Sequence, residues 1–323
     1  MSVLVTGCAG FIGSRVAQRL LDAGETVVGI DNLCDAYDVR LKEHRLALLS
    51  KQSGFSFERM DIAERGSVEK LFQRESYDAV INLAAQAGVR RSVDDPWIYV
   101  DTNVTGTLNL LHVCAQTGIG KFVQASTSSL YGALNPVPFR EDSDTDRPLS
   151  PYAASKKGSE ALCASYHALY DIDISILRYF TVYGPAGRPD MSVYRFIRWI
   201  AEGEPLVLYG DGTQERDFTY VEDIARGTVL ALRPLGFEVI NLGGDRPHSI
   251  LSLIETLEGM IGKRAVIDRQ PPQAADVPRT WASVEKARRL LGWTSEVSFE
   301  EGLERAVRWY IENREWTKDV VLP

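Results

Sequence analysis

Cysteine and histidine are scarce in this chain of 323 residues, which has four of each. The cysteines, Cys8, Cys34, Cys114 and Cys163, are far apart and show neither a CxxC pair nor a Cys/His spacing typical of a metal site. We therefore expect reduced thiols that pack as small hydrophobic side chains, and no bound metal.

An excess of positive charge and long apolar runs are also missing. Lys and Arg number 36 against 44 Asp and Glu, a formal net charge of −8. Phosphate backbones and anionic membranes bind basic faces, so neither a nucleic acid nor a membrane is an expected partner. No run approaches the length of a membrane span, and the chain opens directly on the strand-like segment 3–7 instead of a leader. We expect a cytoplasmic protein.

Short runs rich in Val and Ile alternate with helical stretches in the first half of the chain. The runs lack polar alternation, which is typical of parallel strands buried on both faces. This rhythm predicts an α/β fold, a doubly wound parallel sheet of the Rossmann type with ligands at the carboxyl ends of its strands. The predicted strands are Val3–Thr6, Val27–Ile30, Phe55–Glu58, Ala79–Leu83, Phe122–Ala125 and Ile174–Leu177, and the clearest helices are Gly13–Ala23 and Pro96–Gln116.

The alternation of strands and helices ends after about Leu177, where stretches rich in Gly and Pro begin. We expect residues 1–180 and 218–245 to form the large domain, with Val239–Leu242 returning to the sheet. Residues 181–217 and 246–323 then form a smaller C-terminal α/β domain. Its last helix has one apolar face, made of Leu303, Ala306, Val307, Tyr310 and Ile311.

A glycine-rich turn, GCAGFIG at 7–13, comes after the first strand and opens the first helix. Gly7, Gly10 and Gly13 allow a tight turn, close approach of a pyrophosphate and close packing of helix on strand. The helix N-terminus adds N–H donors and a positive dipole. A glycine triplet alone also fits an ordinary strand–helix turn, so the prediction of a dinucleotide site needs an acidic residue at the end of the second strand as well.

Asp31 ends the second predicted strand, eighteen positions after Gly13. There a carboxylate can accept hydrogen bonds from the adenosine ribose and would repel a 2′-phosphate. Asn32 is not the arginine that a 2′-phosphate needs, so the sequence favours NAD over NADP. The alternative is that Asp31 only caps a loop. Further expected cofactor contacts are Phe11, Ile12, Asn32, Asp61, Ile62, Leu83, Ala84 and Ala85.

Ser150 and Pro151 indicate a helix start, with Ser150 as the cap and Pro151 in the first turn. Tyr152 and Lys156 are then one turn apart on the same face. A phenol has a pKa near 10, and bringing it to about 7 takes roughly 4 kcal/mol of phenolate stabilisation. The lysine ammonium, a cationic nicotinamide and the helix dipole can supply it. The alternative is a surface helix with a chance YxxxK spacing.

A run of hydroxyl side chains, STSSLYG at 126–132, lies at the end of the fifth predicted strand. Thr127 is placed to bind the same substrate hydroxyl that Tyr152 deprotonates, which would orient it for general-base catalysis. Without Tyr152 this run would be an ordinary polar loop.

With these motifs in this order, the chain resembles the extended short-chain dehydrogenase/reductases of the nucleotide-sugar epimerase/dehydratase family along nearly its whole length. The motifs are GCAGFIG, NLAA at 82–85, YxxxK, LRYF at 177–180 and QERDF at 214–218. Within that family, the segments AAQAGVR, STSSLYG and 180–191 are most similar to those of UDP-glucuronate 4-epimerases.

The resemblance implies NAD as cofactor and a shared first step, in which Tyr152 takes the proton of the sugar 4-OH while C4 passes hydride to NAD. The related dehydratases carry Asp-Glu where this chain has Ser128 and Ser129, and UDP-glucuronate decarboxylases carry Glu at the second position. The implied reaction is therefore C4 epimerisation of UDP-glucuronate to UDP-galacturonate through a 4-keto sugar. A UDP-glucose or UDP-GlcNAc type of epimerase and a UDP-glucuronate decarboxylase remain alternatives. A regulatory dinucleotide sensor would not need the tyrosine–lysine pair.

The resemblance also implies contacts for the nucleotide sugar and the cofactor. Arg216 pairs with the diphosphate, Tyr209 lies at the uracil, and Gln273 and Asp276 lie near the ribose, although Ala274-Ala275 replace the usual Pro-Gly. Arg188 binds the uronate carboxylate, with a loop salt bridge to Asp190 as its alternative. The remaining implied contacts are Gln86, Arg90, Thr127, Ser128, Ser129 and Thr181 for the sugar side, and Asn103 and Tyr179 for NAD. Relatives often form homodimers through helices corresponding to 96–116 and 151–170.

Overall fold

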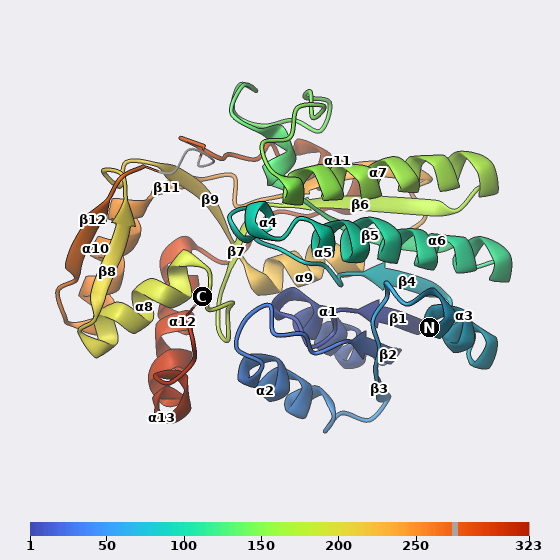
Figure 1. The fold of residues 1–323 in the computed structure, drawn as a ribbon, viewed down its shortest axis with the longest axis horizontal. Coiled ribbons are helices and arrows are strands. Elements are labelled where there is room, and N and C mark those ends of the chain that lie inside the picture. Colours follow the sequence, from blue (N-terminus) through green and yellow to red (C-terminus); the bar gives the residue numbers. More distant parts are fainter. Residues whose placement is uncertain (273–276, 323) are drawn as a thin grey trace.

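The computed structural model describes residues 1–272 and 277–322. Figure 1 shows a large lobe built on one sheet and a smaller lobe beside it. Each strand predicted from the sequence is present, with its ends shifted by a few residues at most. The strands of the large sheet are β1 (Ser2–Thr6), β2 (Thr26–Asp31), β3 (Phe55–Arg59), β4 (Ala79–Asn82), β5 (Lys121–Thr127), β6 (Asp173–Tyr179) and β10 (Phe237–Leu242).

The large sheet has the order β10-β6-β5-β4-β1-β2-β3, and every pairing in it is parallel. The chain builds outward from β1 to β3 and then returns to the other side of β1 with β4. This reversal of direction leaves a crevice at the carboxyl ends of β1 and β4, which is where doubly wound sheets bind ligands. Thr6 pairs with Asn82, so the segments after these two strands start side by side. The Rossmann-type fold is confirmed.

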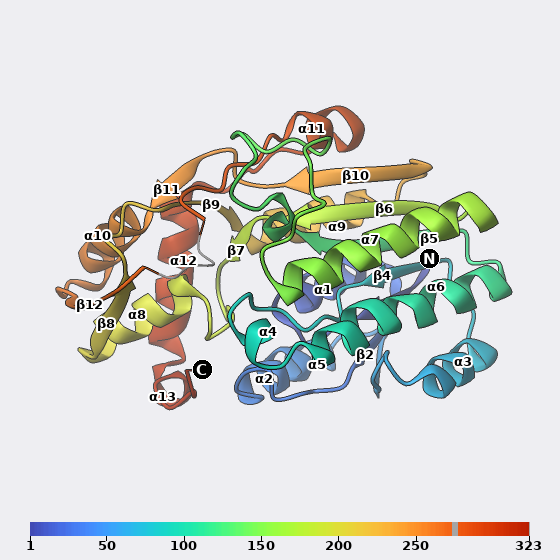
Figure 2. The same ribbon diagram turned by 45° about the horizontal axis from the view of Figure 1, so that its top comes forward.

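Helices cover both faces of the sheet, as Figures 1 and 2 show. One face packs on α1 (Phe11–Asp22), α2 (Arg40–Leu49), α9 (Val221–Leu230) and α11 (Glu285–Leu291). The other packs on α3 (Arg65–Arg74), α6 (Gly106–Thr117) and α7 (Pro151–Tyr170). Fully buried strand residues such as Leu4, Val5 and Ile81 explain the missing polar alternation, because both sides of each strand are covered.

The smaller lobe combines two short sheets with helices. A three-stranded sheet has the order β11 (Pro247–Ser249), β9 (Glu215–Tyr220), β7 (Thr181–Tyr183), and a parallel pair joins β12 (Val266–Gln270) to β8 (Pro205–Tyr209). Helices α8 (Ser192–Glu202), α10 (Ile250–Ile261), α12 (Phe299–Glu312) and α13 (Arg314–Thr317) complete it. Its own apolar core, which includes Ile197, Leu253 and Leu303, lies between these elements.

Three details differ from the sequence-based expectations. Residues 282–293, expected in the smaller domain, pack with the large sheet: Ala287, Leu291 and Trp293 share its core because α11 lies against β10 and α9. The expected helix 96–116 is present and unbroken, but its segment Val100–Thr105, between α5 (Trp97–Tyr99) and α6, is π-helical; a separate short helix, α4 (Arg91–Asp94), precedes it. The apolar face of α12 is not buried throughout, since Ile311 is 49% exposed, whereas Leu303 and Tyr310 are buried.

Candidate active site

One long cavity runs across the carboxyl ends of β1, β2, β4 and β5 and reaches the start of the smaller lobe. It brings together residues that the sequence places far apart. Predicted site residues that line it are Gly7, Gly10, Phe11, Ile12, Gly13, Asp31, Asn32, Asp61, Ile62, Leu83, Ala84, Ala85, Gln86, Thr127, Ser128, Ser129, Tyr152, Lys156, Tyr179, Thr181 and Arg188. Lining residues that sequence reasoning missed include Cys34, Tyr37, Lys42, Met60, Thr102, Phe180 and Met191.

The glycine-rich turn fits the close approach of a pyrophosphate. Gly7 has φ +67°, and a Cβ placed on it would lie 2.7 Å from the backbone nitrogen of Ala84. A Cβ on Gly13 would lie 2.1 Å from the Gly7 carbonyl oxygen, far inside contact distance. Only glycine allows this packing of strand, turn and helix. The residues present therefore match a dinucleotide cradle, and they would hold the cofactor's phosphates at the N-terminus of α1.

Asp31 lies at the end of β2, beside the cavity, with a cation that sequence reasoning overlooked. Its Oδ1 accepts a hydrogen bond from the Leu33 amide at 2.8 Å and lies 3.6 Å from the Lys42 ammonium. Lys42 comes from α2 and is 5% exposed; its burial lowers the pKa of the ammonium, but the negative charges of Asp31 and its neighbours outweigh burial and raise that pKa. Asp31 thus presents an acceptor and Lys42 a donor, a pair suited to a ribose diol. No sequence motif indicated Lys42, because it belongs to a helix eleven positions away.

Tyr152 stands in the first turn of α7, as predicted. The Ser150 side chain caps the helix by accepting from the Ala153 amide at 3.2 Å, and Pro151 occupies the first turn. Burial raises the pKa of the Tyr152 hydroxyl, whereas a hydrogen bond with Thr127, at the end of β5, and the Arg188 charge lower it. Burial is the larger effect, so the described side chains do not produce the lowering of the Tyr152 pKa that the sequence led us to expect.

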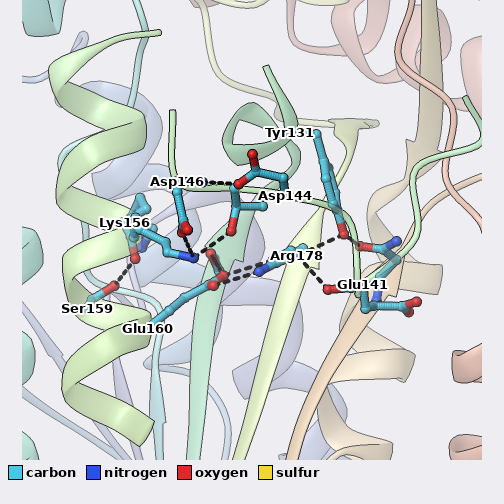
Figure 3. Close-up of polar contacts among 12 residues, drawn as sticks. Tyr131, Glu141, Asp144, Asp146, Lys156, Ser159, Glu160 and Arg178 are labelled. Atoms are coloured by element: carbon cyan, nitrogen blue, oxygen red, sulfur yellow. Dashed lines mark hydrogen bonds and ion pairs between the residues drawn. The ribbon is translucent and has the colours of Figure 1, made fainter. Parts of the chain in front are cut away.

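Lys156 comes one helical turn after Tyr152 and is 2% exposed. Burial lowers the pKa of this ammonium to about 8, while the negative charge of Glu160, a further turn along, raises it. Figure 3 shows Glu160 pointing from α7 to Arg178 on β6. Arg178 donates from Nε at 3.0 Å and from Nη2 at 2.8 Å to the two carboxylate oxygens, and Ser126 donates at 2.5 Å. A buried carboxylate that binds Arg178 and Ser126 thus lies one helical turn after Lys156.

Arg188 reaches the cavity from the loop between β7 and α8. Its guanidinium makes a two-point contact with the Asp190 carboxylate, with Nε to Oδ1 at 3.0 Å, and approaches the Ala87 carbonyl oxygen at 3.4 Å. Its charge acts on the Tyr152 hydroxyl, which places it at the reacting end of the cavity. The structure thus contains the Asp190 salt bridge that was the alternative interpretation, and it also places the guanidinium in the cavity beside Tyr152.

Several predicted site residues do not line this cavity. Asn103 lies behind its wall, where its amide bonds the backbone of Gln86 and the Ser155 hydroxyl. The Arg90 guanidinium lies 4.3 Å from the centre of the Tyr209 ring, a contact between the loop after β4 and the smaller lobe. Arg216 on β9 donates to the carbonyl oxygens of Glu215 and Val277. Gln273 and Asp276 lie outside the described residues.

Neither a metal-binding cluster nor a membrane-spanning helix is found in the part of the chain that the structure describes. No group of three or more His, Cys, Asp or Glu side chains there is arranged to hold a metal ion. No described helix is long and apolar enough to cross a membrane.

The fold and this cavity define an NAD-binding α/β protein with a tyrosine–lysine pair of the short-chain dehydrogenase/reductase type. Residues 3–243 match the NAD dependent epimerase/dehydratase family. The chain belongs to that family.

Individual relatives are similar over almost their entire length. A UDP-glucuronate 4-epimerase of Thermodesulfobacterium geofontis is 56% identical over 318 residues, covering 98% of each chain. The crystal structure of a UDP-glucuronic acid 4-epimerase from Bacillus cereus, in complex with UDP-glucuronic acid and NAD, has a TM-score of 0.91 at 42% identity and covers 97% of this chain and 100% of its own. A UDP-glucose 4-epimerase from Thermotoga maritima with UDP-glucose has the same TM-score at 33% identity, again covering 97% of this chain and 100% of its own.

Proposed function

We propose that this chain is a UDP-glucuronate 4-epimerase, which interconverts UDP-glucuronate and UDP-galacturonate with tightly bound NAD. The observation that carries the proposal is the meeting of Tyr152, Thr127 and Arg188 at one end of the cavity, with Ser128 and Ser129 beside them. A base for the sugar hydroxyl and a cation for a carboxylate thus lie together. The relatives with 56% and 42% identity are both UDP-glucuronate 4-epimerases, which supports the same substrate for this chain.

Bound NAD would supply a reversible hydride acceptor for C4 of the sugar. The Tyr152 oxygen takes the proton of the 4-hydroxyl, and Thr127 binds the same hydroxyl and fixes its direction. Lys156, one helical turn after Tyr152 on α7, would carry a positive charge that favours the phenolate. When the sugar is reduced again, Tyr152 returns the proton, so the cycle needs no other acid or base.

Neutral side chains beside Thr127 restrict the fate of the 4-keto sugar. Ser128 and Ser129 provide hydroxyl groups but no carboxylic acid, so elimination of water lacks a proton donor and a base. Because Asp190 already binds the Nε and Nη2 edge of Arg188, the uronate carboxylate would bind the Nη1 and Nη2 end of the guanidinium, which also allows two parallel hydrogen bonds. Holding that carboxylate near the plane of the ring also slows loss of CO₂ from the ketose, since the breaking C–C bond is then poorly aligned with the carbonyl.

The smaller lobe would bind the nucleotide. In this proposal Arg216 pairs with the diphosphate, Tyr209 lies at the uracil, and Gln86 and Arg90 complete the sugar and phosphate side. Gln273 and Asp276 would contact the ribose. The division into an NAD-binding domain, 1–180 with 218–245, and a UDP-sugar domain, 181–217 with 246–323, belongs to this proposal, with segment 282–293 packed on the first.

Incubation of the purified protein with UDP-glucuronate and no added NAD tests the reaction. We expect UDP-galacturonate, identified by chromatography and NMR, with no net NADH. A UDP-pentose with released CO₂ would indicate a decarboxylase instead, and turnover of UDP-glucose alone would contradict the role of Arg188. In a second experiment, Arg188→Ala should slow the uronate reaction about tenfold to a hundredfold, the cost of losing a charged two-point contact.

We also propose that the protein is a homodimer that works in the cytoplasm. Helices α5, α6 and α7 leave apolar side chains exposed on the outside of the large lobe, including Trp97 at 77% and Leu169 at 71%. Exposed alanines along α7, such as Ala154 and Ala161, would allow close helix packing across a two-fold axis. Light scattering after gel filtration should give a dimer for the natural protein and a monomer for Trp97→Lys. The four free cysteines fit a reducing compartment.

A further inference from the structure

A buried arginine outside the catalytic constellation links the two sides of the cavity. Arg45 lies on α2 of the large lobe and is 3% exposed. It donates from Nε at 3.1 Å and from Nη2 at 2.6 Å to the Ala186 carbonyl oxygen, and from Nη2 at 3.2 Å to that of Gly187. From Nη1 it donates to the Ala9 carbonyl oxygen at 3.2 Å and to the Tyr37 hydroxyl at 2.7 Å.

The environment of Arg45 is unusual for a buried cation. Among residues 1–272 and 277–322, no carboxylate lies within ion-pair distance of its guanidinium, and its acceptors are neutral carbonyl and hydroxyl oxygens. The flanking rings of Phe11 and Tyr37 lie 5.8 and 5.6 Å from it. Burying a charge without a counter-ion is costly, and a hydrophobic side chain of the same size would avoid that cost. Stability alone therefore does not account for an arginine here.

The loop that Arg45 binds is the one that carries Arg188. Its backbone is bent twice into the left-handed region, at Gly184 with φ +149° and at Ala186 with φ +53°. Alanine is disfavoured in that region, so the conformation at Ala186 needs external support. The two hydrogen bonds from Arg45 to the Ala186 carbonyl supply it.

A second arginine supports the same loop more weakly. Arg15 on α1 donates from Nη2 to the Pro185 carbonyl oxygen at 3.3 Å and is itself paired with Glu222. The carbonyl oxygens of Pro185, Ala186 and Gly187 thus all accept from arginines of the large lobe. Arg188 is the next residue, and its direction into the cavity depends on these three peptide units.

We propose that Arg45 is a positioning residue for substrate selectivity, which fixes the 184–188 loop against the glycine-rich turn and so sets where Arg188 meets a sugar carboxylate. This inference rests on the proposed uronate substrate. Arg45 acts through Arg188 and touches neither the sugar nor the reacting atoms. Its planar fork spans three carbonyl oxygens and a hydroxyl at once, which a lysine ammonium on a single stem does not match.

The decisive experiment compares Arg45→Lys, Arg188→Ala and the double variant. For each enzyme we would measure kcat and KM for UDP-glucuronate and the inhibition constant of UDP-glucose, which has no carboxylate. Arg45→Lys should raise the KM for UDP-glucuronate about tenfold and change the UDP-glucose constant by less than about twofold, because only the carboxylate contact is lost. In the Arg188→Ala background the same change should add less than about twofold, since both act on one interaction.

Arg74→Gln is the matched control, because Arg74 is an exposed arginine on α3, paired with Glu58 and remote from the loop. It should leave all three constants unchanged. Thermal midpoints and NAD content identify an Arg45 variant that has lost its fold, in which case Arg45→Gln replaces it and is measured in the same way.

The possible outcomes distinguish a failure of the Arg45 inference from a failure of the proposed function. An equal loss toward UDP-glucuronate and UDP-glucose, or full additivity with Arg188→Ala, would overturn the role of Arg45 while the natural enzyme still epimerises UDP-glucuronate. A natural enzyme that does not act on UDP-glucuronate would overturn the proposed function instead. Hydrogen exchange of the 184–188 amides tests positioning without any sugar: Arg45→Lys should speed it by about tenfold or more, and unchanged exchange would contradict the inference.

Discussion

The two ends of the cavity are built in different ways. At the cofactor end, backbone geometry makes the site, because Gly7 and Gly13 pack against peptide groups at distances that exclude any Cβ. At the sugar end, side chains make it, since Thr127, Tyr152 and Arg188 come from a strand end, a helix start and a loop. A backbone site tolerates almost no substitution and is readable as a motif. A side-chain site can be changed one group at a time, and it depends on the tertiary contacts that aim each group.

Tyr152→Phe should produce the largest change and should act on catalysis alone. Removal of the hydroxyl deletes the base while the ring keeps its edge-to-face contact with Tyr99, whose centroid lies 6.1 Å away. We expect kcat to fall about 100- to 10,000-fold. NAD content and thermal midpoint should match the natural protein, and a large loss of either would mean that Tyr152 also has a structural role.

Glu160→Gln tests whether the buried ion pair between Glu160 and Arg178 stabilises the sugar end of the cavity. The change leaves the Arg178 charge buried without its carboxylate, and breaking such a pair costs about 3–5 kcal/mol of unfolding free energy. Urea denaturation measures this directly. Exposed pairs offer a control: Glu304→Gln, which removes the partner of Arg308, should change the unfolding free energy by less than about 1 kcal/mol.

Gly13→Ala tests the cofactor end. The added Cβ meets the Gly7 carbonyl oxygen, so helix α1 must move away from β1, at a cost of about 3 kcal/mol. We expect the NAD content of the purified protein and its thermal midpoint to fall together. Gly66→Ala, where no atom lies within 4 Å of the added carbon, should leave both unchanged. Retention of full NAD by Gly13→Ala would contradict the idea that backbone geometry makes this end.

The pH dependence of kcat should report on Lys156. Burial lowers the pKa of this ammonium to about 8, so its charge is present below that pH and is lost as the pH rises through it. If the charge supports the phenolate, kcat should fall on the alkaline side of about pH 8. Glu160 raises the pKa of Lys156, so in Glu160→Gln the fall should begin at lower pH. If kcat of Glu160→Gln falls at the same pH as in the natural protein, the charge of Glu160 does not set the pKa of Lys156.

Ile311→Gln should have the smallest effect. Ile311 is 49% exposed on α12, so replacing it should alter the unfolding free energy by less than about 0.5 kcal/mol. Leu303→Ala on the buried face of the same helix should cost about 2–5 kcal/mol. Similar costs for the two changes would mean that Ile311 is covered in solution, for example by a partner.

Much of the cofactor end was predictable because its signals are local. Gly7, Gly13 and Asp31 come after predicted strands at fixed distances, and a parallel sheet brings such segments to one edge. Lys42 was missed for the opposite reason, since a single lysine among the charged residues of α2 carries no signal until the fold places its ammonium 3.6 Å from Asp31. The exposure of Ile311 escaped prediction similarly, because an apolar face defined by helical periodicity does not show how far the neighbouring elements extend.

The sequence by itself determined the parallel sheet, the glycine-rich turn, and the helix on which Tyr152 and Lys156 stand one turn apart. These features depend on the spacing of apolar residues, on the missing Cβ of glycine and on helix capping, all of which act between near neighbours in the chain. Tertiary structure alone decided that Arg178 pairs with the Glu160 carboxylate. It also decided that Arg188 lies beside Tyr152, and that Arg45 reaches the 184–188 loop from another lobe. Those contacts join residues far apart in the chain, and only the packing of whole elements brings such groups within hydrogen-bonding distance.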